Sequence, residues 1–241
     1  MRRRWLYGLF SLLILALSGC GGVQSGQQAV CTAETFIPNY VPRLERLLHW
    51  GGFPVRVYFV KDENYTELRQ SIALQGFDQW VERSEMKIHY QLVDSQESAQ
   101  IVVRFDPSTR DGLTEYRFRT NGQLVSATIS IGVKGNSAVD IRSVAAHEFG
   151  HALGIGGHSD NPADMMYPTF ASGIPLQITE RDFNTLKTAY CNLFLKGEPS
   201  RAVPADETLL HFTIRCGTPG CASAQEHNNK QADCSKSPTM R

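Results

Sequence analysis

The sequence predicts an α+β fold, with about five strands and three principal helices in one domain. Residues 55–60 and 124–133 alternate between apolar and polar positions and are rich in β-branched residues, which predicts strands. An apolar stripe at helical spacing, from Leu68 to Val81, predicts a long helix. A third apolar segment, residues 141–152, encloses two histidines and a glutamate and predicts a buried helix. A chain of 241 residues that is 41% apolar suits one globular domain with tails.

The first half of the chain alternates between helical and strand signals. Leu44, Leu47 and Leu48 lie at helical spacing and predict one or two helical turns. The long helix should begin near Asn64, because Asn64 and Glu67 form a capping signature, and should end near residue 84. The strands are expected at 55–60, 86–93, 99–105, 116–119 and 124–133.

Turn and capping signals define the second half. Asn121-Gly122 predicts a tight hairpin, and the strand that follows it, 124–133, should form an edge of the sheet. The buried helix should begin near residues 137–140. The stretch Thr179 to Asp182 caps a last helix that reaches Tyr190.

The buried helix carries a candidate metal site in the run His147-Glu148-Phe149-Gly150-His151. Residues four apart leave the same face of a helix, so both imidazoles can reach one zinc ion at about 2.0–2.1 Å. Glu148 can reach a water molecule at the metal without binding the metal, and act as a general base. Metal ligation also satisfies polar groups whose burial would otherwise cost free energy.

A third ligand should come from the loop after the helix. Gly154 can end the helix in a left-handed conformation, which lets His158 return to the metal. Three protein ligands and a water molecule are typical of a catalytic zinc site. Asp160 is the alternative third ligand, and the sequence leaves this choice open.

The pattern H-E-F-G-H-A-L-G, followed by His158 and by Met166-Tyr167-Pro168, resembles the matrixins among the metzincin metallopeptidases. The resemblance covers about residues 50–194. It implies a zincin-like catalytic domain with a twisted mixed sheet, one catalytic Zn²⁺, and hydrolysis of a peptide or protein substrate. Met166 would form an apolar floor beneath the zinc in a Met-turn, and Tyr167 and Pro168 would shape the substrate pocket.

The resemblance has one departure and one further implication. The family has two residues between the glycine and the third histidine, whereas this chain has three, Ile155-Gly156-Gly157. The two glycines can absorb the extra residue, because both tolerate positive φ. In the family an edge strand beside the cleft pairs with extended substrate, and the matching positions here would be Ser126 to Ile131.

Residues 1–19 resemble a bacterial lipoprotein signal. Three arginines precede a short apolar run, and Cys20 follows Leu-Ser-Gly as in a lipobox. Cleavage before Cys20 and acylation of Cys20 would hold the protein on a membrane surface of the bacterial cell envelope, the outer membrane in a Gram-negative cell. A plain signal peptide with an incidental cysteine and an uncut anchor are the alternatives.

Four segments are therefore expected: a signal peptide at 1–19, a lipid-anchored tether at 20–42, the peptidase domain at 43–195, and a tail at 196–241. The tail should be largely disordered or loosely attached, with one strand at Leu209 to Ile214.

Without residues 1–19 the chain has 21 basic and 24 acidic side chains. This balance and the absence of a basic stripe argue against nucleic-acid binding. We expect a monomer, and no motif indicates Ca²⁺.

Five cysteines remain after acylation of Cys20, and export would permit disulfides. Cys31 with Cys191 would tie the N-terminal extension to the last helix, Cys216 with Cys221 could close a tight loop, and Cys234 is left over. The run Arg215-Cys216-Gly217-Thr218-Pro219-Gly220 also resembles the matrixin cysteine switch, R-C-G-x-P-D, in which a thiolate on the zinc keeps the enzyme inactive. Here the run follows the domain instead of preceding it.

These patterns together predict an exported, membrane-anchored zinc endopeptidase with Glu148 as general base. Two alternatives stay open. One is a catalytically inactive metzincin-fold lipoprotein that acts by binding. The other is an autoinhibited enzyme that is silent until its tail is cut. The substrate and the cleavage preference do not follow from the sequence.

Overall fold

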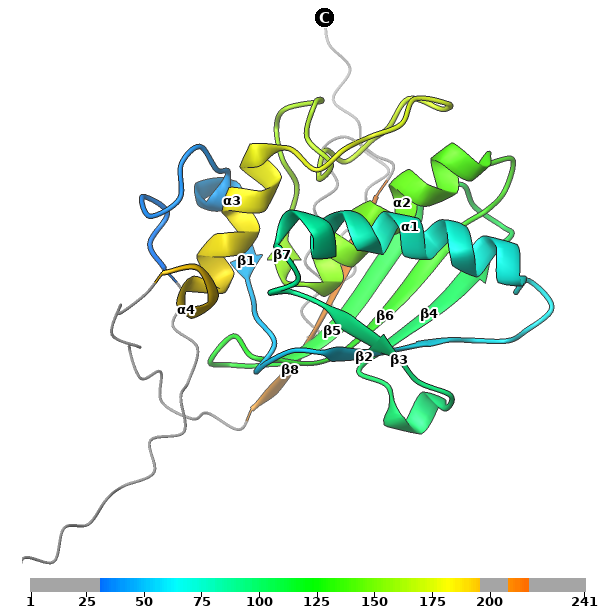
Figure 1. Cartoon of the computed structure of the whole chain (residues 1–241), viewed down its shortest axis with the longest axis horizontal. Helices are drawn as coiled ribbons and strands as arrows, with labels where there is room; N and C mark the ends of the chain where they lie inside the picture. Colours follow the sequence, from blue (N-terminus) through cyan, green and yellow to red (C-terminus); the bar gives the residue numbers. More distant parts are fainter. Residues whose placement is uncertain (1–30, 196–207, 217–241) are drawn as a thin grey trace, which may run out of the picture.

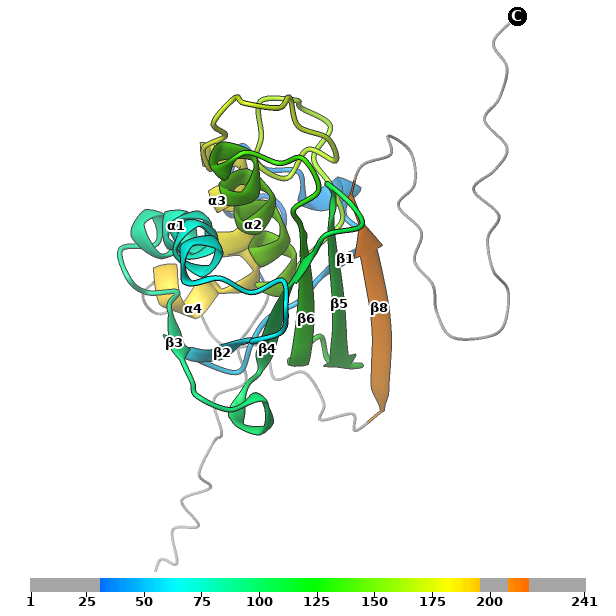
Figure 2. The same ribbon diagram turned by 90° about the vertical axis from the view of Figure 1, so that its right-hand side faces the viewer.

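The computed structural model describes residues 31–195 and 208–216, and it confirms the α+β class. A six-stranded sheet has the order β3-β2-β4-β6-β5-β8. Its strands are β2 (Val55–Phe59), β3 (Tyr90–Leu92), β4 (Ile101–Asp106), β5 (Gly112–Arg119), β6 (Leu124–Gly132) and β8 (Leu209–Arg215). The helices are α1 (Glu67–Arg83), α2 (Ala138–Ala152), α3 (Glu180–Ala189) and α4 (Cys191–Phe194), with 3₁₀ turns at Val41–Arg43 and Gln96–Ser98. Helices α1 and α2 lie side by side over one face of the sheet (Figures 1 and 2).

The sheet is mixed. Strand β2 pairs in parallel with β3 and β4, and β4 pairs in parallel with β6. Strand β5 is antiparallel to both β6 and β8. The hairpin around Asn121-Gly122 is confirmed, and it joins β5 to β6.

The prediction that residues 124–133 form a sheet edge is wrong. Strand β6 lies inside the sheet, because its register with β4 runs from Ala127 to Gly132. The hairpin sequence shows that two strands are neighbours, but not which of them lies outside. Strand β5 takes the outer position of the hairpin, and β8 covers its far side, as Figure 2 shows. The proposed substrate-pairing positions Ser126 to Ile131 therefore do not lie on a free edge.

Three element boundaries also differ from expectation. Strand β5 begins at Gly112, four residues before the expected start at Tyr116. Thr66, not Asn64, caps α1, since its Oγ1 accepts a hydrogen bond from the backbone N–H of Arg69 at 3.1 Å. The strand expected from Met86 begins at Tyr90, because Glu85 and Met86 have φ angles of 52° and 64°. Such left-handed residues form a turn and cannot continue a strand.

The helical turns expected from Leu44 to Leu48 are wrong as well. The chain instead forms a short strand β1 (Arg46–Leu47), which pairs antiparallel with β7 (Ile155–Gly156). The backbone N–H of Leu48 donates to the carbonyl of Gly154 at 2.9 Å. Pairing with the loop after α2 thus overrides the helical spacing of the leucines.

Both expected tails contribute to the described fold. A disulfide joins Cys31 to Cys191, as expected. The Tyr40 hydroxyl donates to Asp182 on α3 at 2.9 Å, so the described part of the expected lipid-anchored tether, residues 31–42, packs against the domain. The described part of the expected tail, 208–216, is also not loosely attached, because β8 pairs with β5 from Leu209 to Arg215. None of the described helices has the length and apolar character needed to cross a bilayer.

Candidate metal and catalytic site

Helix α2 is held rigidly between α1 and the sheet. It begins with a capping box between Ser137 and Asp140, near its expected start. Phe149 stacks on Phe77 of α1 with ring centroids 4.2 Å apart. The Nε1 of Trp80 donates to the carbonyl of Ala146 at 2.8 Å. This packing fixes the direction in which the helix projects its polar side chains.

His147 and His151 point their Nε2 atoms at one another, 3.0 Å apart. The Nδ1 of His147 contacts the carbonyl of Met165 at 2.7 Å, and the Nδ1 of His151 contacts the carbonyl of Ile155 at 2.7 Å. A carbonyl only accepts, so each Nδ1 carries the proton and each Nε2 presents a lone pair. Two lone pairs that face each other at this distance repel unless a cation lies between them.

His158 completes the cluster, and its ring centroid lies 5.3 Å from that of His147 and 5.0 Å from that of His151. Of the two glycines in the loop to His158, Gly157 has a φ of +147°, whereas Gly156 lies in β7 and pairs with β1. Gly154 has a φ of +119°, and a Cβ there would lie 2.0 Å from the carbonyl oxygen of Leu48, so only glycine fits. Asp160 instead pairs with Arg43 and Arg181, each at 2.9 Å. The structure thus brings His158, not Asp160, to the other two histidines.

Burial keeps these three imidazoles neutral. It lowers the pKa of His147 to about 4 and that of His158 to about 3. The pKa of His151 is also lowered by burial, well below its usual value. Neutral imidazoles are the form that binds zinc, so three neutral ring nitrogens converging on one point fit a Zn²⁺ ion.

Glu148 is fully buried next to the histidines. Its Oε2 accepts a hydrogen bond from the Thr114 hydroxyl of β5 at 2.6 Å. Gly112 leaves the room for this carboxylate, since a Cβ at Gly112 would lie 2.0 Å from Oε1. Burial raises the pKa of Glu148 to about 7. A carboxyl group with that pKa can both accept and return a proton near neutral pH.

Cys216 enters the same site from the end of β8. It is a free, buried thiol, which excludes the expected pairing with Cys221 in this arrangement. Its Sγ donates to Oε1 of Glu148 at 3.0 Å and lies 3.7 Å from Nε2 of His151 and 3.6 Å from Nε2 of His158. Tetrahedral zinc bonds of about 2.3 Å to sulfur and 2.05 Å to nitrogen place those atoms about 3.6 Å apart. The four side chains therefore fit one tetrahedral zinc ion.

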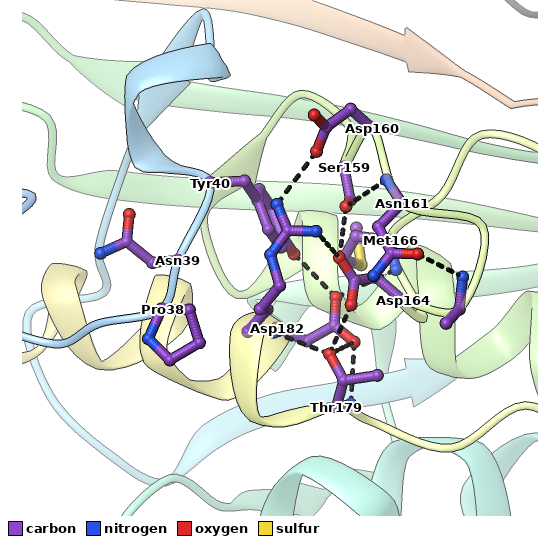
Figure 3. Close-up of polar contacts among 12 residues, drawn as sticks. Pro38, Asn39, Tyr40, Ser159, Asp160, Asn161, Asp164, Met166, Thr179 and Asp182 are labelled. Carbon is purple, nitrogen blue, oxygen red and sulfur yellow. Dashed lines mark hydrogen bonds and ion pairs between the residues drawn. The ribbon is translucent and has the colours of Figure 1, made fainter.

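A network of carboxylates supports the loop beneath the histidines (Figure 3). Asp182 accepts hydrogen bonds from the backbone N–H groups of Met165 at 2.8 Å and Met166 at 3.2 Å. The carbonyl of Met165 in turn orients His147. Asp164 accepts from the Thr179 hydroxyl at 2.7 Å and pairs with Arg181. Met166, the predicted Met-turn residue, is fully buried, and its side chain packs against Gly150 of α2.

A cavity of about 300 Å³ opens beside Glu148. Tyr167 and Pro168, the predicted substrate-pocket residues, line it together with His147, Val144 and Leu176. Cys216 also borders the cavity. The site therefore combines a metal-binding cluster, a carboxylate and an adjoining space large enough for a side chain.

Comparison with known proteins agrees with this geometry. A family model described as matrixin matches residues 61–191. The chain belongs to the matrixin family. The chain is similar to Metalloendoproteinase 2-MMP of Arabidopsis thaliana, with 44% identity over 50 residues, which cover 21% of the chain and 13% of that relative. Matrix metalloproteinase-20 of Homo sapiens is 53% identical over 36 residues, 15% of the chain and 7% of the relative.

A longer match, to Matrix metalloproteinase-27 of Homo sapiens, has 34% identity over 80 residues and covers 32% of the chain and 15% of that relative. The chain thus spans only a small fraction of these relatives. Membership of the matrixins confirms the metzincin-type fold and indicates a zinc metallopeptidase.

Sequence reasoning missed three residues that shape the site. Thr114 holds Glu148, and no local pattern marks it. The capping pattern assigns Asp182 only to the start of a helix, yet the same carboxylate accepts hydrogen bonds from the backbone of Met165 and Met166. The leucine spacing predicts a helical turn around Arg46, whereas Arg46 lies on β1 beside β7.

Proposed function

We propose that this matrixin is an exported, membrane-anchored zinc endopeptidase. The convergence of His147, His151 and His158 beside the buried carboxylate of Glu148 supports this function most directly. When bound, zinc would polarise the scissile carbonyl and lower the pKa of a water molecule toward ~7.

The protein's own residues would supply the proton transfers and the binding. Glu148 would accept the proton of the attacking water and pass it to the leaving amine, while Thr114 holds the carboxylate in place. The backbone carbonyl of Met165 would keep His147 in the tautomer that binds metal through Nε2, and the carbonyl of Ile155 would do the same for His151. The cavity lined by Tyr167 and Pro168 would take one side chain of the substrate.

The test is cleavage of a fluorogenic peptide mixture by zinc-loaded protein comprising residues 29–241 with Cys216→Ala. Glu148→Gln in the same background is the matched control, since it keeps the shape of the side chain and removes the base. Turnover that a zinc chelator abolishes, and that the glutamine variant lacks, is expected. The absence of turnover by zinc-loaded protein, both with Cys216→Ala and after deletion of residues 196–241, would contradict the peptidase and favour a protein that acts by binding.

A specific observation supports a second proposal, that the C-terminal segment inhibits the enzyme. Cys216 lies where the fourth ligand of a zinc ion would be, and it also binds Glu148. Four protein ligands are typical of structural zinc sites, which leave no position for water. Deletion of residues 196–241 from the otherwise wild-type protein should raise its peptidase activity. Unchanged peptidase activity would contradict autoinhibition.

The membrane anchor rests on the sequence Leu17-Ser18-Gly19-Cys20, which lies outside the described residues. We expect the protein to incorporate a labelled fatty acid in a bacterial host and to sediment with membranes. Cys20→Ser is the control and should abolish both. Labelling that persists in this variant would contradict acylation at Cys20.

A further inference from the structure

Strand β8 extends the central sheet beyond β5. Its register with β5 runs from Leu209 opposite Arg119 to Arg215 opposite Leu113. The backbone N–H of Cys216 then donates to the carbonyl of Gly112 at 3.3 Å. In Figure 2, β8 is the orange strand on the outer side of β5, and its arrowhead lies at the end of the sheet nearest the loops that follow α2. An extended segment bound along β5 is thereby delivered to the metal site.

The side chains of β8 alternate between two environments. Phe212, Ile214 and Cys216 face inward and are 2%, 5% and 8% exposed. Thr213 is half-buried and Arg215 is exposed on the opposite face. Cys216 is therefore the residue that faces the metal site. Ile214 lies two positions before it in the chain, and Phe212 lies four positions before it.

Phe212 has a specific receptor surface on the domain. Its ring stacks on Tyr116 of β5 with centroids 5.3 Å apart. The guanidinium of Arg46 lies 5.3 Å from the Phe212 ring and 5.2 Å from the Phe118 ring. We call Arg46, Tyr116 and Phe118 the aromatic clamp.

The clamp is built from segments that are distant in sequence. Tyr116 and Phe118 belong to β5, and Arg46 belongs to β1, which also holds the loop to His158 through β7. Cation–π and aromatic contacts of this kind favour a planar ring over an aliphatic or small side chain. Strand addition itself is not selective, so the pockets for alternate side chains decide which peptide binds.

We propose that β8 occupies the place of an extended peptide substrate and that the aromatic clamp selects the substrate. The preferred substrate is a peptide that runs antiparallel to β5 and carries an aromatic residue four positions before the residue that faces the metal site. An apolar residue two positions before the metal-facing residue, where Ile214 lies, adds to recognition. This inference rests on the proposed endopeptidase function, and it means that the tail and the substrate compete for one surface.

The first test does not depend on catalysis. In the zinc-loaded full chain, the rate at which iodoacetamide labels Cys216, followed by peptide mapping, reports how often β8 leaves β5. Phe212→Ala should raise this rate about tenfold or more, because it removes the ring held by the clamp. Thr213→Ala, on the other face of the same strand, removes only a hydroxyl that lies 3.4 Å from Glu115 of β5 and should change the rate far less than Phe212→Ala. Equal rates for the two variants would overturn the role of the clamp.

The second test measures selectivity in the full chain carrying Phe212→Ala and Cys216→Ala, in which the tail is weakened and the thiol removed. The probes are two peptides with the sequence of residues 208–215 followed by alanine and further apolar residues, one with the natural Phe and one with Ala at the position of Phe212. Mass spectrometry locates the cleaved bond. The Phe peptide should have a kcat/KM about tenfold higher.

Clamp variants separate selectivity from activity. Tyr116→Ala and Arg46→Ala should bring the two kcat/KM values together, while Tyr116→Phe should keep the preference because the ring remains. Equal cleavage of the two peptides by the unmodified clamp would overturn this inference and leave the peptidase standing. Cleavage of neither peptide would contradict the peptidase, and the labelling of Cys216 would then decide whether the clamp holds β8.

Discussion

The thiol of Cys216 donates a hydrogen bond to Oε1 of Glu148 at 3.0 Å. One contact thus joins the residue expected to act as general base with a residue that arrives from the C-terminal end of the chain. The same sulfur lies 3.6–3.7 Å from two of the three histidine Nε2 atoms. The described arrangement is therefore that of a closed site, in which the tail would fill the position that a substrate or water needs.

Cys216→Ala should increase peptide cleavage by zinc-loaded protein by about tenfold or more, because the fourth position becomes free for water. Cleavage of one fluorogenic peptide, with the zinc content of each preparation measured, checks this. Arg215→Ala, which alters an exposed neighbour, is the control and should leave cleavage as in the wild type. If the two variants have the same activity, Cys216 does not inhibit.

Asp182→Asn should lower the free energy of unfolding by about 2–3 kcal/mol, since a buried carboxylate loses part of its hydrogen bonding to the Met-turn. It should also weaken zinc binding, because the Met165 carbonyl that orients His147 is no longer held. Urea unfolding and zinc titration measure the two effects. Asp160→Asn, on the surface, should change neither by much. An Asp182→Asn protein as stable as the wild type would contradict this role.

Gly154→Ala should cost about 3 kcal/mol or more of unfolding free energy. The new Cβ would combine a φ of +119° with a contact of 2.0 Å to the Leu48 carbonyl oxygen. Gly173→Ala is a matched control, because Gly173 has a φ of +78° but no atom within 4 Å of the added Cβ. It should cost about 1 kcal/mol. Similar costs for the two variants would show that β1 does not hold the loop closely.

The disulfide between Cys31 and Cys191 should stabilise the domain, since it closes a loop with a sequence separation of 160 residues. The double variant Cys31→Ser/Cys191→Ser should lose about 2–5 kcal/mol of unfolding free energy. Adding a reductant to the wild type should give the same loss in denaturant unfolding, and should not affect the double variant. No loss in either experiment would mean that the noncovalent contacts of residues 31–42 with α3, such as the hydrogen bond from Asn184 to Pro38, hold the N-terminal segment without the disulfide.

Local patterns were sufficient for most of the elements and for the core of the site. The spacing of His147 and His151 needs only the helical repeat, and their helix begins near the residues that the sequence indicated. The hairpin at Asn121-Gly122 depends on two turn residues. In each case the physical cause lies within a few residues of the feature that it produces.

The errors arise where partners are distant in sequence. Leu44 to Leu48 have helical spacing, but β1 forms because β7, more than 100 residues later, offers backbone hydrogen bonds. The hairpin pattern predicts an edge position for β6, because nothing local shows that β4 pairs with it. The tail composition predicted loose attachment, while the register of β8 on β5 brings Cys216 to the histidines. Such pairings follow from the whole sheet and not from any one segment.

The central claim, that Cys216 closes the zinc site, is tested most directly by X-ray absorption spectroscopy of the zinc-loaded full chain. The wild type should show three nitrogen ligands and one sulfur ligand at about 2.3 Å, and Cys216→Ala should show an oxygen or nitrogen in place of the sulfur. A wild-type spectrum with only nitrogen and oxygen ligands would contradict the claim.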